Sequence, residues 1–215
     1  MTVPILVSFA LILVAYLLGS IPTGYLAGRI LKGIDIREYG SGSTGATNVL
    51  RTVGKGAAVG VLIVDMFKGM VAVAMVKGAY FWLDTTILPT AWQNWLVVTG
   101  ALLAVLGHSK SVWLNFSGGK SAAISLGVLL VMSPWVGLGT LFTFLIVLYF
   151  SRIVSLSSLS GALAVNILML IFTPLIPYIV FAVLAGLYVT IRHRSNIERI
   201  LAGKEPRIGE AVSQG

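Results

Sequence analysis

The 215-residue chain contains no cysteine, few charged residues and only two histidines. The absence of cysteine excludes disulfides, a thiolate nucleophile and cysteine-ligated metal sites. With His108 and His193 as the only histidines, a histidine-rich metal site is not expected either. Charged residues make up 10% of the chain, where a soluble domain carries about 25%. Hydrophobic residues make up 57%, and a bilayer can solvate that much apolar surface. We therefore expect an integral membrane protein without a metal or cofactor.

Seven apolar segments are candidates for membrane spans. They cover residues 3–24, 56–78, 95–107, 122–132, 135–150, 159–172 and 177–191. Several are shorter than the roughly 20 residues of a spanning helix, so flanking residues or local thinning of the bilayer would have to extend them. The predicted fold is an all-α bundle of seven transmembrane helices, forming a single domain over residues 1–215. Residues 203–215 are expected to be a flexible cytoplasmic tail.

The basic residues are distributed unevenly among the connections. Residues 29–55, 110–121, 151–158 and 192–215 hold 13 of the 15 Lys and Arg. The positive-inside rule places these segments in the cytoplasm. This predicts a multi-pass protein of the cell (inner or plasma) membrane, with an outside N-terminus, a cytoplasmic C-terminus and a polar face toward the cytoplasm. We interpret the net charge of +8 as contact with anionic lipid headgroups, not with nucleic acid.

The first basic loop carries a motif suited to anions. It reads Gly-Ser-Gly-Ser-Thr-Gly-Ala-Thr-Asn from Gly40 to Asn48, and Arg51 follows. Gly40 and Gly42 permit backbone N–H groups to converge, Ser41 and Asn48 add neutral donors, and Arg51 adds a bidentate donor for phosphate. A flexible turn that caps the next helix is an equally good interpretation of this loop alone.

The second basic loop reads Phe-Ser-Gly-Gly-Lys-Ser from Phe116 to Ser121. Gly118 and Gly119 offer backbone groups at the start of a helix, and Lys120 offers a point charge. A nucleotide P-loop would need glycine at position 114, which is Leu114, so we exclude ATP and GTP. A smaller anion is favoured over a simple helix cap.

Two further segments carry polar side chains on the same face. Ser155 lies in a serine-rich stretch whose local interpretation is a helix cap, and no G-x-S-x-G elbow supports a serine nucleophile. His193 and Asn196 are three residues apart and share one helical face.

Asp65 and Lys68 are predicted to pair inside the bundle. Converging loops without an acid–base pair indicate a phosphate site that acts by positioning and charge stabilisation.

These motifs together resemble the PlsY family, bacterial membrane enzymes that acylate glycerol 3-phosphate from acyl phosphate. The resemblance covers nearly the whole chain, and also includes Gly19–Gly24, Asp65 with Lys68-Gly69, and Gly107-His108. It implies a seven-helix fold. It also implies formation of 1-acylglycerol 3-phosphate (lysophosphatidic acid) and inorganic phosphate, the first acylation of phospholipid synthesis. The implied partners are acyl phosphate, glycerol 3-phosphate and membrane lipid, and the soluble enzyme that supplies acyl phosphate is a further candidate.

The resemblance also assigns roles to site residues. Lys120, Arg51, Ser41 and His193 are the expected catalytic residues. The expected substrate-binding residues are Gly40, Gly42, Asn48, Gly118, Gly119, Ser155 and Asn196. We expect a substrate phosphate oxygen to take the proton of the attacking hydroxyl, with His193 as a weaker candidate base. One departure from the family pattern is Ser121, where glycine is usual. The alternative function is a transporter or channel for a phosphorylated solute, which would place ionisable groups along a pathway.

Overall fold

The computed structural model describes residues 2–210 and is helical with short connections in this range. Its α-helices are α1 Thr2–Ser20, α2 Thr23–Lys32, α3 Ala46–Thr52, α4 Lys55–Trp82, α5 Gln93–Ser109, α6 Ala122–Met132, α7 Pro134–Ser151, α8 Val154–Phe172, α9 Ile176–Arg192 and α10 Arg194–Leu201. Short 3-10 turns are η1 Ile36–Glu38, η2 Thr90–Trp92 and η3 Val112–Leu114.

Each of the seven predicted apolar segments forms a helix, and α6 has the predicted ends. The start of α8 differs from the prediction: the helix begins at Val154 and not at residue 159. Ser155 therefore lies in the first turn of a helix, where a loop was expected. The short helices α2, α3 and α10 were not predicted, because each has few residues and no apolar run of spanning length.

Five helical segments are long and apolar enough to cross a membrane: Thr2–Lys32, Lys55–Trp82, Thr90–Ser109, Pro134–Ser151 and Val154–Phe172. Helices α9 and α10, which meet at a bend of 63°, form a sixth if the bent pair is counted as one span. Helix α6 has 11 residues, which extend about 16 Å at 1.5 Å per residue. That is about half of a hydrocarbon core of about 30 Å. The protein is thus a multi-pass helical membrane protein.

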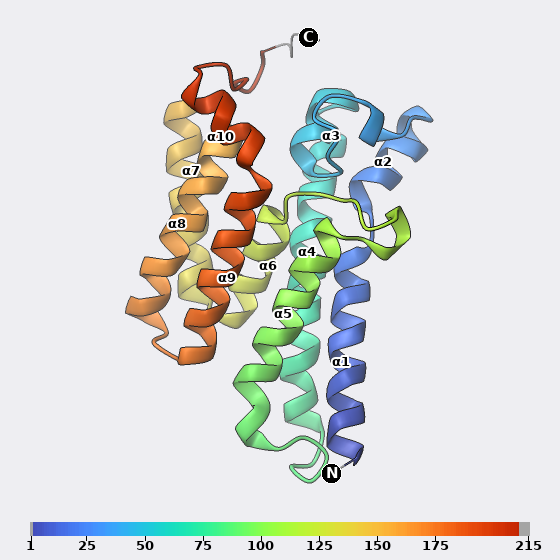
Figure 1. Ribbon diagram of the computed structural model, residues 1–215, viewed down its shortest axis with the longest axis vertical. Helices are drawn as coiled ribbons and strands as arrows, with labels where there is room; N and C mark the ends of the chain where they lie inside the picture. The colour runs from blue at the N-terminus through green and yellow to red at the C-terminus, as the bar shows by residue number, and fades with distance from the viewer. Residues whose placement is uncertain (1, 211–215) are drawn as a thin grey trace.

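The helices form two groups joined by α6 and by a direct contact between α5 and α9 (Figure 1). Helices α1, α4 and α5 pack together, as do α7, α8 and α9, and α6 contacts both α4 and α7. The contact between α6 and α4 is close, because a Cβ at Gly127 would overlap the carbonyl oxygen of Met66. Small side chains such as Ala72 and Ala104 fill the buried core beside Phe181. Small residues permit this close approach of helices in lipid.

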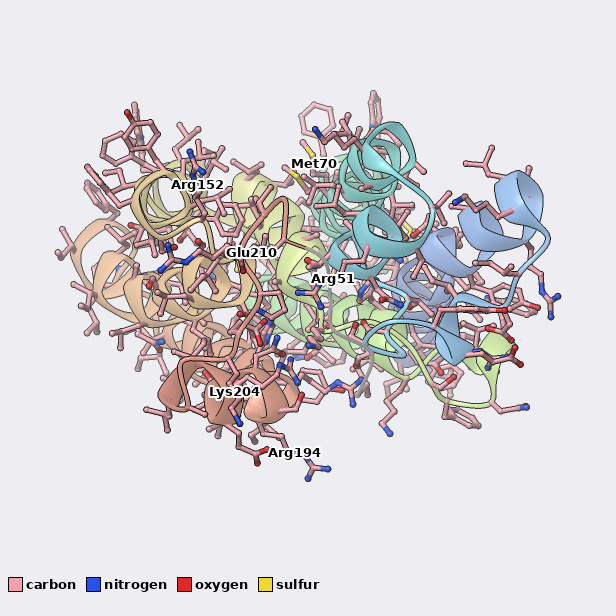
Figure 2. The ribbon with its side chains drawn as sticks, turned by 90° about the horizontal axis from the view of Figure 1, so that it is seen from above. Arg51, Met70, Arg152, Arg194, Lys204 and Glu210 are labelled. Carbon is pink, nitrogen blue, oxygen red and sulfur yellow. The ribbon has the colours of Figure 1, made fainter. Side chains whose placement is uncertain are left out.

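The four basic segments lie at the same end of the bundle, the upper end in Figure 1. This end contains the loop before α3, the connection between α5 and α6, the α7–α8 turn and α10. Figure 2, which looks onto this end, shows Arg51 near the middle of the molecule and Arg194 at its edge. The alternation of basic and uncharged connections therefore predicted correctly which segments share a face.

Candidate active site

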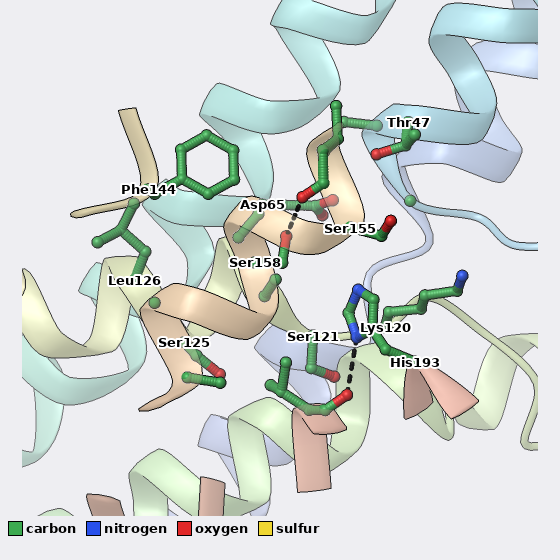
Figure 3. A pocket seen from close by; sticks show the side chains of 18 of the residues that line it. Thr47, Asp65, Lys120, Ser121, Ser125, Leu126, Phe144, Ser155, Ser158 and His193 are labelled. Atoms are coloured by element: carbon green, nitrogen blue, oxygen red, sulfur yellow. Dashed lines mark hydrogen bonds between the residues drawn. The ribbon is translucent and has the colours of Figure 1, made fainter. Parts of the chain in front are cut away.

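A cavity of about 240 Å³ lies beneath the basic end, between α3, α4, α6, α7, α8 and α9. Its wall carries seven of the predicted site residues, namely Ser41, Asn48, Arg51, Lys120, Ser155, His193 and Asn196. Figure 3 shows Lys120, His193 and Ser155 around a common space. The four predicted glycines are not part of the wall, so they contribute through the shape of their loops.

The side chain of Asn48 is committed to the loop that precedes it. Its Oδ1 accepts from the Ser41 N–H at 2.9 Å. Its Nδ2 donates to the carbonyl oxygens of Ile36, Tyr39 and Ser43 at 3.0, 3.0 and 2.9 Å. Because Asn48 is 1% exposed and its amide is occupied, its role in this structure is to shape the loop. The proposal that it contacts substrate directly has no support from these contacts.

Gly40 and Gly42 allow the same loop to turn sharply. Both have positive φ, 60° and 66°, and a Cβ at Gly40 would overlap Asn48 Oδ1. The Gly42 N–H donates to the Tyr39 carbonyl at 3.1 Å. The glycines thus let the chain wrap around Asn48, and this wrapping brings Ser41 to the cavity wall.

Gly118 and Gly119 pack tightly in the second loop. The Gly119 N–H donates to the His108 carbonyl at 3.1 Å, so it does not point at the cavity as the sequence suggested. Arg192 Nη2 donates to the Gly119 carbonyl at 3.1 Å. The Gly119 N–H therefore faces the protein interior and not a ligand. Of this loop, Lys120 is the residue that brings a charge to the cavity wall.

Ser121, the departure from the family pattern, adopts the left-handed conformation with φ 65°. Its Oγ donates to the Val105 carbonyl at 2.8 Å. This hydrogen bond, worth about 1 kcal/mol, offsets a conformational cost of about 1–2 kcal/mol for a residue with a Cβ. Serine thus preserves a backbone turn for which glycine is best suited.

Lys120, the central cation of the site, donates from Nζ to Asn196 Oδ1. Burial lowers the pKa of Lys120 to about 8, and the nearby Arg199, Arg51 and Arg192 lower it as well. The positive charges that surround it are not balanced by the single carboxylate of Glu205. This excess of positive charge favours a bound anion.

Glu205 is a site residue that the sequence reasoning missed. It is 7% exposed. Its Oε1 accepts from Ser155 Oγ at 2.9 Å and Asn196 Nδ2 at 2.7 Å, and its Oε2 accepts from Arg199 Nε at 2.6 Å. Burial alone would raise the pKa of the Glu205 carboxyl, but these hydrogen bonds hold it below its ordinary value. The predicted tail thus begins with an anchored segment, while residues 211–215 lie outside the described range.

His193 follows the last residue of α9 and is 4% exposed. Its Nδ1 lies 2.7 Å from the Val189 carbonyl oxygen, and the carbonyl can only accept, so Nδ1 carries the proton. Burial, together with the charges of Lys120 and Arg192, lowers the pKa of His193 to about 4. At neutral pH the ring is therefore uncharged, with Nε2 available as a hydrogen-bond acceptor.

The deeper part of the cavity is apolar. Leu126 on α6 and Phe144 on α7 lie on one side of the site, opposite Thr47 and Lys120 (Figure 3). A polar mouth and an apolar interior suit a ligand with a charged head and a hydrocarbon chain. Among residues 2–210, no group of three or more acidic or histidine side chains is placed to hold a metal ion.

Asp65 and Lys68 form the predicted buried pair, with Lys68 Nζ 2.9 Å from Asp65 Oδ1. The sequence did not predict that His108 joins this pair. Its Nδ1 lies 3.5 Å from the same carboxylate oxygen. Asp65 and His108 both lie on the cavity wall.

Comparisons with known proteins show the family of this chain. The glycerol-3-phosphate acyltransferase family model matches residues 9–203. A glycerol-3-phosphate acyltransferase of Rippkaea orientalis is 62% identical over 208 residues, covering 97% of this chain and 96% of its own. One of Synechocystis sp. is 59% identical, covering 99% of this chain and 96% of its own.

Two solved structures have the same fold. Both are of PlsY, an integral membrane glycerol 3-phosphate acyltransferase, and both are 33% identical to this chain. The glycerol 3-phosphate form has a TM-score of 0.84 and covers 94% of this chain and 96% of its own. The lysophosphatidic acid form has a TM-score of 0.80, with 94% and 95% covered. The resemblance seen in the sequence is confirmed, and the chain belongs to the glycerol-3-phosphate acyltransferase family.

Proposed function

We propose that this protein transfers an acyl group from acyl phosphate to glycerol 3-phosphate, giving lysophosphatidic acid and inorganic phosphate. The observation that supports this most strongly is the division of one cavity into a cationic mouth and an apolar interior. An acyl phosphate has a matching division, because its charged group is joined directly to its hydrocarbon chain. The family and the two related structures support the acceptor.

In the proposed reaction, the acceptor hydroxyl oxygen forms a bond to the carbonyl carbon of the acyl phosphate. The bond from that carbon to the phosphate oxygen breaks, and phosphate leaves with the electron pair. Lys120 and Arg51 neutralise phosphate charge as it develops. Ser41 orients the phosphate groups, Ser155 holds the Glu205 carboxylate beside the site through its Oγ, and the acyl chain occupies the apolar part of the cavity.

The hydroxyl proton passes to a substrate phosphate oxygen in this proposal. Neutral His193 is the alternative acceptor, since its Nδ1 is bonded to Val189 and its Nε2 is available. The rate profiles of His193→Ala and the wild type against pH distinguish the two. Substantial remaining activity supports the substrate as base, and complete loss in a folded variant supports His193.

We further propose seven spans, with the N-terminus outside, the C-terminus and the site in the cytoplasm, and the protein in the cell's inner or plasma membrane. The common position of the basic segments supports this orientation. A cytoplasmic site would be accessible to soluble glycerol 3-phosphate and to a soluble enzyme that supplies acyl phosphate.

The donor is tested with purified protein in detergent. Glycerol 3-phosphate is offered with acyl phosphate and, separately, with the acyl thioester of coenzyme A. The proposal predicts that lysophosphatidic acid forms when acyl phosphate is the donor and does not form when the thioester is the donor. Product from the thioester at an equal rate would contradict it.

A further inference from the structure

A group of three ionisable side chains lies below the loop that carries Lys120. Asp65 and Lys68 come from α4 and are 1% and 4% exposed, and His108 comes from the last turn of α5 and is 7% exposed. The proposed reaction gives none of them a role. Ionisable groups inside a membrane bundle are costly to bury, and they more often serve function than stability.

The Asp65 carboxylate is held from several directions. Its Oδ1 accepts from Lys68 Nζ at 2.9 Å and from Thr23 Oγ1, and it lies 3.5 Å from His108 Nδ1. Lys68 also donates to the Ile21 carbonyl at 2.8 Å. Asp65 on α4 is therefore linked to α5 and to the start of α2. Through Lys68 it is also linked to the short connection between α1 and α2. Such a carboxylate can fix the orientation of the imidazole beside it, with the proton on Nδ1.

His108 in turn supports the two glycines that precede Lys120. Its carbonyl oxygen accepts from the Gly119 N–H at 3.1 Å. A Cβ at Gly119 would overlap His108 Nε2, and a Cβ at Gly118 would overlap the His108 carbonyl oxygen. The ring edge and the backbone of one histidine thus define where both glycines lie, and Lys120 is the next residue in the chain.

We infer that Asp65 and His108 are positioning residues for Lys120, acting through Gly118 and Gly119. This inference rests on the proposed role of Lys120 in binding phosphate. Lysine is a point charge on a flexible stem, so the placement of its ammonium depends on the placement of its backbone. If the ring of His108 tilts, Gly119 moves and the Lys120 ammonium moves away from the phosphate.

The experiment compares His108→Phe, which keeps an aromatic ring but loses the contact with Asp65, with His108→Asn, whose amide can replace the Nδ1 donor. We expect His108→Phe to lower kcat/KM about 10-fold or more, chiefly through a higher KM for glycerol 3-phosphate. His108→Asn should retain more activity. Asp65→Asn should behave like His108→Phe.

A double-mutant cycle with Lys120→Arg separates positioning from mere stability, because Lys120→Arg keeps the charge but places it differently. If His108 acts through Lys120, His108→Phe has a much smaller effect in the Lys120→Arg background than in the wild type. Equal, additive losses in both backgrounds would overturn the inference, and so would an unchanged KM in folded His108→Phe.

Lys77→Met is the matched control. Lys77 is another lysine of α4, and it donates to the Val131 carbonyl at 3.0 Å, away from the cavity. The substitution Lys77→Met should lower the unfolding temperature without changing KM for glycerol 3-phosphate. If His108→Phe does not fold, the cycle is run with Asp65→Asn/Lys68→Met, which removes both buried charges. A wild-type enzyme without turnover would contradict the proposed function instead of this inference.

Discussion

The carboxylate of Glu205 receives hydrogen bonds from residues of two helices, Ser155 of α8 and Asn196 and Arg199 of α10. Its contact with Asn196 fixes which way the amide points. The Asn196 Oδ1 is thereby directed at Lys120 Nζ. Glu205 thus fixes the positions of the Ser155 and Asn196 side chains. Through Asn196 it also fixes the position of the Lys120 ammonium.

We predict that Glu205→Gln lowers the free energy of unfolding by about 1.5–3 kcal/mol, because hydrogen bonds to a charged group are weakened. In the wild type this contribution is complete above the ordinary carboxyl pKa of 4.5 and is lost as the pH falls below it, since folding lowers this pKa. Thermal unfolding in detergent at several pH values measures both effects.

Glu198→Gln is the control for this prediction, because Glu198 is exposed on α10 and contributes no hydrogen bond from its side chain among residues 2–210. It should leave stability and activity unchanged. A Glu205→Gln variant as stable as the Glu198→Gln variant at pH 7 would show that the Glu205 network contributes little.

The charge of Lys120 should be visible in kinetics. Because its pKa is about 8 in the free protein, the fraction of charged ammonium falls as the pH rises through this value. We predict that kcat/KM for glycerol 3-phosphate falls above pH 8, and that Lys120→Arg moves this limb to higher pH, since arginine stays protonated. An unchanged alkaline limb in Lys120→Arg would assign the titration to another group.

At this scale, motifs in the sequence indicated which residues line the cavity. They did not indicate which hydrogen bonds the side chains form. Arg51, Lys120 and His193 were identified from their motifs and lie on the cavity wall. Asn48 was also predicted from its motif, but its amide binds the loop around it, which composition does not reveal. Glu205 was missed because its partner Ser155 lies 50 residues away in the chain.

At the scale of elements, the long helices followed from apolar length alone. The ends of α6 matched because Ser121 and Ser133-Pro134 interrupt the apolar run on either side. Helices α3 and α10 could not be found in this way, since their stability comes from packing beneath and beside the site and not from a long apolar face.

Helices α4 and α6, which both line the cavity, are in close contact at Gly127. We predict that Gly127→Ala lowers the free energy of unfolding by about 1–3 kcal/mol, because the added Cβ would overlap the Met66 carbonyl and force the helices apart. Thermal unfolding in detergent measures the change.

Gly60→Ala on α4 is the matched control, because a Cβ there has no neighbour within 4 Å among the described residues. It should be neutral or stabilising by up to about 1 kcal/mol, since alanine favours helix over glycine. Equal effects of both substitutions would show that the α4–α6 contact is not tight.

At the scale of the whole molecule, the basic segments lie at one end of the bundle, and a buried apolar core lies between its helices. A transporter for a phosphorylated solute would need a polar pathway through both ends. Among residues 2–210, Asp65 Oδ1 is contacted by Lys68, His108 and Thr23, and Lys68 also donates to the Ile21 carbonyl, whereas Asp65 Oδ2 is buried without a hydrogen-bond partner. The arrangement favours chemistry at an interface.

The most direct test of the central claim is a stoichiometric assay of the purified protein with acyl phosphate and glycerol 3-phosphate. We predict that phosphate release and lysophosphatidic acid formation rise together in a 1:1 ratio, and that Lys120→Met abolishes both in a folded protein. Absence of both products in the wild type, together with flux of glycerol 3-phosphate into liposomes, would contradict the account and support transport.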